Sequence, residues 1–170
     1  MAETVAEVIV GTAVLSYNLN AGDAVGVGTW VSVGLTEDGV TMTYTADMAD
    51  IEVEEETFPI KRVITKETVE ITCNIAQNSI TNLNLALAGG VLAAPNITLG
   101  AGVVKPIAIK IVGVNLGTGA ATNRTVWMPY AQSVGAVGQS YRKGEKTLVP
   151  VTFQGFQNTA GATVCTISDA

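Results

Sequence analysis

The chain has 170 residues, enough for one domain with a buried core, and we expect a single domain over residues 1–170. Apolar residues make up 48% and charged residues only 14%, so much of the surface must be uncharged, as is typical of a protein that associates with other subunits. The net charge of −6 argues against a protein that grips nucleic acid through its phosphates.

The first half of the chain alternates with period two, which predicts β-strands. Val5–Tyr17 is apolar on both faces, as in a strand that is covered on both sides. Residues 30–46 contain a Glu-Asp-Gly turn at Glu37–Gly39, and the alternating residues after it are interpreted as the second strand of a hairpin. Residues 67–75 alternate apolar and polar side chains, which predicts a strand with one polar face.

One segment has helical spacing instead. The pattern predicts a helix over about residues 79–88, with Ser79 or Asn78 as the cap and Gly89–Gly90 as a left-handed stop. Its helically spaced apolar residues are Ile80, Leu83 and Leu87. Short strand-like runs follow at residues 105–114, 124–132, 146–156 and 162–168. The sequence therefore predicts a mainly β protein, a two-sheet β-sandwich or barrel with one short α-helix.

Several protein classes are not expected. No apolar run approaches the roughly 20 residues that cross a bilayer, and residues 1–11 lack the basic start and apolar run of a signal peptide, so we expect a mature cytoplasmic product without membrane insertion. Without histidine, neither a Ser-His or Cys-His pair nor a common zinc site can form. We expect no enzyme, no cofactor and no metal, and we interpret Cys73 and Cys165 as buried free thiols.

Charge is concentrated between Met48 and Val63. Acids at every second position would share one face of an extended chain, and these acids are Asp50, Glu52, Glu54 and Glu56. Directly opposed like charges destabilise a sheet, and the bases Lys61, Arg62 and Lys66 follow at once. A calcium loop would need spaced Asp or Asn, a Gly and a terminal Glu, which are missing here. The remaining alternatives are a solvated charged edge and a contact with another subunit.

Four stretches occur in a characteristic order. Residues 7–18 form an apolar opening strand, and residues 30–40 read Trp-x-x-x-Gly-x-Thr-x-x-Gly-Val. Residues 59–90 read as strand, turn, strand and short helix, and residues 147–168 as a closing strand pair with a Pro-Val-Thr-Phe core. In this order, over most of the chain, the sequence resembles the major tail tube proteins of long-tailed bacteriophages.

The resemblance implies a structural virion protein of the phage tail, assembled in the host cytoplasm. Its fold would be a sandwich flanked by a helix, with a long loop or hairpin. Hexameric rings would stack into a hollow tube, the conduit for genome ejection, and strands from each subunit would pool in one closed barrel. The implied partners are other copies of the chain, a tape-measure protein and tail terminator or tip proteins. Genomic DNA would pass through the lumen without specific binding.

The resemblance also gives the charged segment a role. In this family the stretch that corresponds to Ala46–Pro59 reaches the adjacent ring, where its acids would meet basic residues and set register. Alternatively the acids face the lumen, where negative charge repels DNA phosphates. The candidate contact residues are Asp47, Asp50, Glu52, Glu54, Glu55, Glu56, Lys61, Arg62, Arg142 and Lys143.

Two other functions remain open. A tube protein of a type VI secretion or related phage-like injection system would share the ring-forming sandwich. An extracellular adhesin or pilin-like module would need an export signal or a donor strand, and the sequence offers neither clearly.

Overall fold

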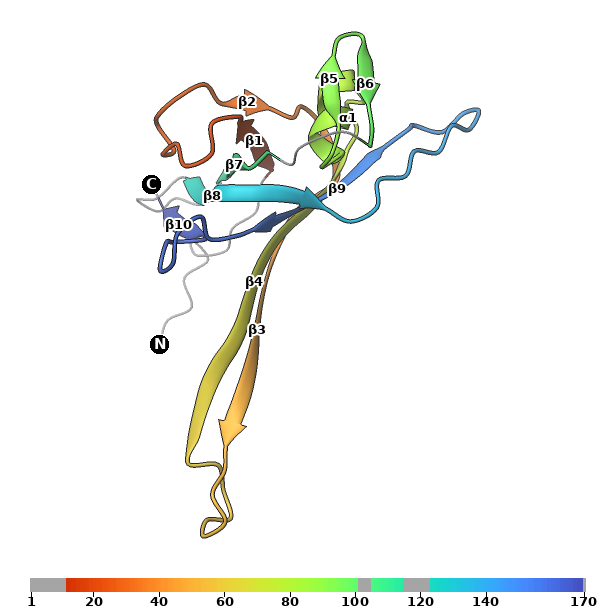
Figure 1. Ribbon diagram of the computed structural model, residues 1–170. Helices are drawn as coiled ribbons and strands as arrows, with labels where there is room; N and C mark the ends of the chain where they lie inside the picture. Colours follow the sequence, from red (N-terminus) through yellow and green to blue (C-terminus); the bar gives the residue numbers. More distant parts are fainter. Residues whose placement is uncertain (1–11, 101–104, 115–122, 170) are drawn as a thin grey trace, which may run out of the picture.

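The computed structural model describes residues 12–100, 105–114 and 123–169, and these contain ten strands and one helix (Figure 1). The strands are β1 (Ala13–Asn18), β2 (Val31–Ser32), β3 (Thr36–Ile51), β4 (Lys61–Ile75), β5 (Val91–Ala93), β6 (Asn96–Thr98), β7 (Ile107–Val114), β8 (Asn123–Val134), β9 (Val149–Gly155) and β10 (Thr166–Asp169). The helix is α1 (Ile80–Ala86).

The strands form two antiparallel sheets of unequal size. The large sheet has the order β2-β1-β7-β8-β9-β4-β3, and β10 pairs with β8 beside it. The small sheet is the hairpin β5-β6. The mainly β class with one short helix and a long hairpin is therefore confirmed.

The core lies where β1, β7, β8, β9 and the inner half of β4 pack against one another and against α1. The predicted alternation of residues 67–75 is confirmed, because Val69, Ile71, Cys73 and Ile75 are all buried. Phe153 on β9 is fully buried among them. Strands with one apolar face are stabilised in this way by the burial of that face.

Strand β1 confirms part of the first prediction. Leu15, Ser16 and Tyr17 are all buried, so successive side chains on opposite faces of this strand are covered. Val14 is exposed, and the residues before Thr12 lie outside the described part of the chain.

Helix α1 is confirmed, with Ser79 as its cap. The Ser79 Oγ accepts a hydrogen bond from the Asn82 backbone N–H at 3.1 Å. The side chain of Asn82 is buried, and its Nδ2 donates to the carbonyls of Val33 and Gln77, both at 2.8 Å. The predicted left-handed stop is wrong: the helix ends at Leu87 in an extended conformation, and neither glycine of Gly89–Gly90 has a positive φ.

The predicted turn at Glu37–Gly39 is also wrong. Strand β3 runs through this point, and the register against β4 shifts between Glu37 and Val40. Asp38 has φ 61° and Gly39 has φ 80°. A left-handed residue pair suits a tight turn and a β-bulge equally well, and here it forms a bulge within one long strand.

Candidate assembly surface

The outer half of the β3-β4 hairpin, residues 44–67, projects from the rest of the molecule, and we call it the arm (Figure 1). β3 has 16 residues and β4 has 15, and they pair with each other from Thr36 and Ile75 out to Ile51 and Lys61. β9 pairs with β4 only over Glu70–Ile75. Within the described residues, the arm therefore has no other strand beside it.

The base of the arm carries one side-chain hydrogen bond between its strands. The Tyr44 hydroxyl donates to Glu67 Oε1 at 2.6 Å, and this acceptor raises the pKa of Tyr44. Cross-strand contacts of this kind hold a hairpin in register.

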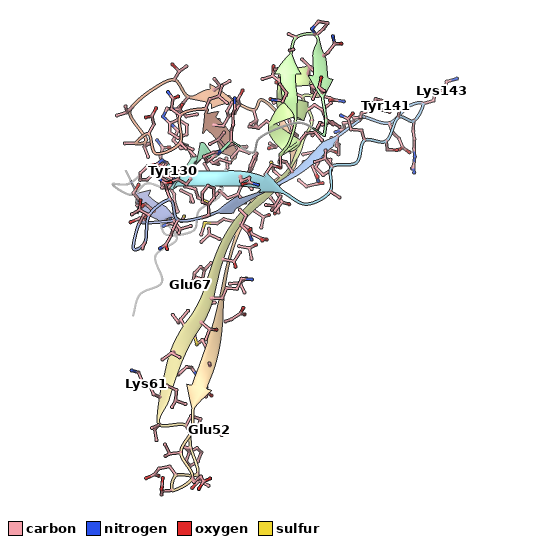
Figure 2. All side chains as sticks on the ribbon, viewed as in Figure 1. Glu52, Lys61, Glu67, Tyr130, Tyr141 and Lys143 are labelled. Carbon is pink, nitrogen blue, oxygen red and sulfur yellow. The ribbon has the colours of Figure 1, made fainter. Side chains whose placement is uncertain are left out.

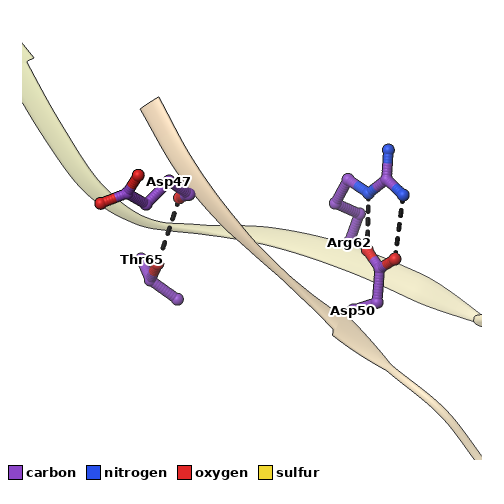
Figure 3. A network of polar contacts seen from close by, with 4 residues as sticks. All are labelled: Asp47, Asp50, Arg62 and Thr65. Atoms are coloured by element: carbon purple, nitrogen blue, oxygen red, sulfur yellow. Dashed lines mark hydrogen bonds and ion pairs between the residues drawn. The ribbon is translucent and has the colours of Figure 1, made fainter. Parts of the chain in front are cut away.

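The middle of the arm carries an ion pair. Asp50 lies directly opposite Arg62, whose Nε and Nη2 donate to the two Asp50 carboxylate oxygens at 2.5 Å and 2.9 Å (Figure 3). The hydrogen bonds from Arg62 lower the pKa of Asp50. Nearby, Thr65 Oγ1 donates to the Asp47 carbonyl at 3.1 Å, where the register shifts again. Arg62 was expected to contact acidic residues of another ring, but here it forms an ion pair with Asp50 of its own hairpin.

The acids beyond the ion pair lie in the tip of the arm, residues 52–60. The predicted single acidic face is wrong, because β3 ends at Ile51 and only Asp50 of the alternating set lies in the strand. The exposed tip acids are Glu52, Glu54, Glu55 and Glu56. No ion pair in the described part of the chain involves these acids or Lys61. The tip therefore presents concentrated, uncompensated negative charge.

The arm also exposes large apolar side chains. Phe58 in the tip is 82% exposed, and Met48 on β3 is 56% exposed. The full apolar set of the arm is Tyr44, Met48, Ile51, Val53, Phe58, Ile60 and Ile64. Sequence reasoning concentrated on the charges and missed this set. The sequence did contain a signal for this set. Apolar and polar residues alternate over a longer stretch than the core of a domain of this size can bury.

The accessible surface of the chain is correspondingly large, at 11005 Å². A compact monomer of this mass would expose roughly 7,900 Å². The excess of about 3,000 Å² is several times the ~800 Å² that one partner contributes to an interface of standard size. The uncovered hairpin of the arm contributes part of this excess.

A second projection, residues 135–148, carries the remaining candidate bases, and we call it the side loop. Tyr141 and Lys143 lie near its outer end, far from Glu52 at the arm tip (Figure 2). Arg142 lies 3.6 Å from Glu145, and Lys146 forms an ion pair of 2.6 Å with Glu37 at the bulge of β3. The tip acids and the bases Arg142 and Lys143 therefore occupy separate projections of one chain, whereas the candidate bases Lys61 and Arg62 lie on the arm itself.

Three further features of the described residues concern metal ligands, long apolar helices and thiols. Among residues 12–100, 105–114 and 123–169, no group of three or more His, Cys, Asp or Glu is placed to hold a metal ion. Within the same ranges, no helix is long and apolar enough to cross a membrane. Burial raises the pKa of the Cys73 thiol to about 11 and also raises that of Cys165. Both thiols are free, as expected, but only Cys73 is buried; the expectation that Cys165 is buried is wrong, because this residue is half-buried.

Comparison with known proteins gives one structural neighbour to report. No protein-family model matches the sequence, and no curated protein matches it. Among solved structures, the chain is similar to one described as "Crystal structure of Hcp protein". The similarity has a TM-score of 0.39 and 12% sequence identity, and it covers 93% of this chain and 98% of that chain.

Proposed function

We propose that this protein is the repeating subunit of a self-assembled tube in a phage-like injection apparatus. The observation that carries the proposal is the arm, which extends an uncovered apolar hairpin away from the core. Exposed apolar surface of this extent is typical of a protein–protein contact. Copies of the same chain are the simplest partner, because the chain as a whole has few charged residues to oppose association.

The sheet edges support a ring. One edge of the large sheet is β2-β1 and the other is β3, so the two edges are unlike. Contacts between unlike surfaces are heterologous, and they close into a ring when the rotation between subunits allows it. Pairing of edges between subunits would also remove the exposed strands that otherwise favour uncontrolled aggregation.

The finer proposal is a phage tail tube, and it rests on the order of sequence stretches described above. In that setting the chain forms hexameric rings in the virion tail, beside a tape-measure protein and terminator or tip proteins, with DNA passing through the lumen. The tube of a type VI secretion system is the second candidate, since it would share the ring-forming sandwich. A gene for a tape-measure protein next to this one would favour the phage tail.

The arm tip has a specific role in this proposal. Its acids, at Glu52 and Glu54–Glu56, contact Arg142 and Lys143 on the side loop of a subunit in the next ring. Opposite charges on two separate projections suit a contact between molecules, since complementary potential sets register and excludes wrong partners. Lys61 joins the tip acids as a neighbouring charge. In the alternative arrangement the tip acids face the lumen and repel DNA.

Negative-stain microscopy of the purified protein over a range of concentrations tests the proposed function. We expect hollow rings or tubes that increase with concentration. A protein that stays monomeric at the highest concentrations would refute the proposal.

Charge reversal tests the contact of the tip. The variant Glu52→Lys, Glu54→Lys, Glu55→Lys leaves Asp50 with Arg62, so the hairpin should keep its register. If the tip docks on the next ring, rings should accumulate without elongating, and adding Arg142→Glu and Lys143→Glu should restore tube length. Tubes of normal length with slowed, salt-sensitive DNA release would instead place the acids in the lumen.

A further inference from the structure

One face of the β3-β4-β9 part of the large sheet has no helix or strand of the described chain packed on it. The opposite face is the core side, since Ile71 on β4 and Phe153 on β9 are fully buried. Residues of β1, β7 and α1 belong to the same buried cluster, so these elements pack on the core side. Side chains alternate across a strand, so Thr72 and Thr152 point away from the core. We call the face that carries them the back face.

Two rows of side chains cross the back face. In the first row, Thr41 lies opposite Thr72, and Thr72 lies opposite Thr152. Val134 on β8 continues this row, because it lies opposite Thr152. All four residues line one open cavity of about 250 Å³, as expected for side chains on a single face. The first row therefore presents mainly threonine hydroxyl and methyl groups.

The second row lies one pair of residues closer to the arm tip. It consists of Thr43, Glu70 and Gln154, which are paired in register across β3, β4 and β9. Gln154 Nε2 donates a hydrogen bond to Glu70 Oε1 at 3.0 Å. Glu70 is the one charged residue of the two rows, and this hydrogen bond holds its carboxylate against the sheet.

The two rows contain no basic residue. The chain has nine lysines and arginines, and they lie on the arm, in the side loop, just before β7, on β7 and on β8. Lys146 comes close to the first row, but its ammonium forms an ion pair with Glu37 at 2.6 Å. Binding of a polyanion requires cations that neutralise its phosphates. The rows are therefore a poor surface for holding nucleic acid.

The chemistry of the back face also differs from that of the proposed subunit contacts. The arm exposes large apolar side chains, and the arm tip and the side loop carry opposite charges. The rows offer neither of these features. Hydroxyl and amide groups lose hydrogen bonds to water when they are buried without new partners. The back face therefore suits a surface that stays in contact with water, and a tube has two such surfaces, the outer wall and the bore.

Two observations favour the bore. A cation in the bore would hold DNA phosphates, whereas a cation on the outer wall would not, and the rows contain none. A loop on the wall would obstruct a bore, and the rows carry short side chains instead. The loop of residues 19–30 packs on a different part of the sheet, where Trp127 Nε1 on β8 donates to the Asp23 carbonyl at 3.1 Å.

We propose that the back face lines the bore of the tube and that its rows let a polyanion pass without ionic contact. The inference rests on the proposed function and adds to it the surface that faces the passing cargo. Passage should then depend little on salt, because the rows exchange no counterions with the cargo.

Labelling of cysteines with reagents of two sizes tests the proposal. Thr41→Cys and Thr43→Cys are made separately in a Cys165→Ser background, in which the remaining Cys73 is buried. Both threonines are exposed, so a small maleimide and a maleimide carried on a large globular protein should each label the monomer. In tubes, the small reagent should still react along the whole length. The large reagent should react only near the ends, so its yield should fall as tubes lengthen.

The Cys165→Ser protein without an added cysteine is the matched control and should give no label. Labelling of tubes by both reagents along their length would place the back face on the outer wall and overturn the inference. Protection from both reagents would place it in a contact between subunits, with the same consequence. Assembly of the control but of neither cysteine variant would also show a subunit contact there. Absence of tubes from the original protein and from the control would instead refute the proposed function itself.

A charge substitution gives a second readout. The double variant Thr41→Lys, Thr43→Lys adds a cation to each row, so tubes should retain short double-stranded DNA roughly tenfold more strongly at low salt than the original tubes do. The retained DNA should resist a nuclease and be released by salt. The neutral double variant Thr41→Gln, Thr43→Gln is the matched control and should retain no more DNA than the original. Equal retention by the two variants, or retained DNA that the nuclease digests, would contradict the inference.

Discussion

A substitution of Phe58 distinguishes an effect on assembly from an effect on folding. The Phe58 side chain is 82% exposed in the single chain, so Phe58→Ala removes almost no contact that stabilises the monomer. If the arm tip is buried between subunits, the same change removes most of a phenyl group from an interface. Full burial of such a side chain contributes about 1.5–3 kcal/mol, so we expect a loss near 2 kcal/mol per contact.

This loss is large enough to measure. About 2 kcal/mol corresponds to roughly a 30-fold weaker association, which should appear as a 30-fold higher concentration for half-maximal tube formation. Sedimentation across a concentration series measures this value, and urea unfolding of dilute monomer should give the same free energy of unfolding as the original protein. Phe153→Ala is the converse control, since Phe153 is fully buried and its loss should destabilise the monomer by about 3–5 kcal/mol. Unchanged assembly by Phe58→Ala would refute the role of the arm.

Three further predictions address the tip, a thiol and the helix anchor. A protease that cuts after glutamate should cleave the tip loop at Glu52–Glu56 in monomers and spare it in tubes; equal cleavage in both states would show that the tip is not covered. Burial raises the pKa of the Cys73 thiol from 9.0 to about 11 in the folded protein. The folded state therefore holds the thiol proton more tightly than the unfolded state does, and the stability that this gives is complete below pH 9 and is lost as the pH rises through about 11. The free energy of unfolding should fall by about 2–3 kcal/mol over this range. Urea titrations should show a flatter pH dependence for Cys73→Ala, and an identical slope would contradict this cause. Asn82→Ala should lower the free energy of unfolding by about 1–3 kcal/mol, because the carbonyl of Val33 loses its buried donor; an unchanged urea midpoint would contradict the anchor.

The sequence predicts those parts of the fold that depend on a local pattern of residues. The alternation around Ile71 and Cys73 identifies a strand because one face of the sheet is buried. Ser79 identifies the helix start because few residue types satisfy the first free N–H groups. Both features depend on neighbours in sequence, and both are confirmed.

The parts that sequence reasoning missed depend on register. Asp38 and Gly39 adopt the left-handed conformations of a turn, yet pairing with β4 makes them a bulge. Asp50 meets Arg62 only because the irregularities along β3 and β4 bring these two residues opposite each other. A shift of the strand register by one residue would move every side chain to the other face of the sheet. No local sequence pattern determines this register. The uncovered apolar set of the arm was missed for a related reason, because alternation does not say where the core ends.

Because the arm is separate from the core, the length of the arm can change independently of the core. Removing two residues from each strand between the ion pair of Asp50 and the hydrogen bond of Tyr44 would keep every side chain on its face and shorten the arm by about 7 Å. Because such a change touches no core residue, the reach of the subunit can vary while its folding does not. In the proposed assembly, the length of the arm would set the spacing of the units that it connects, and related chains with the same body would differ in this spacing if their arms differ in length.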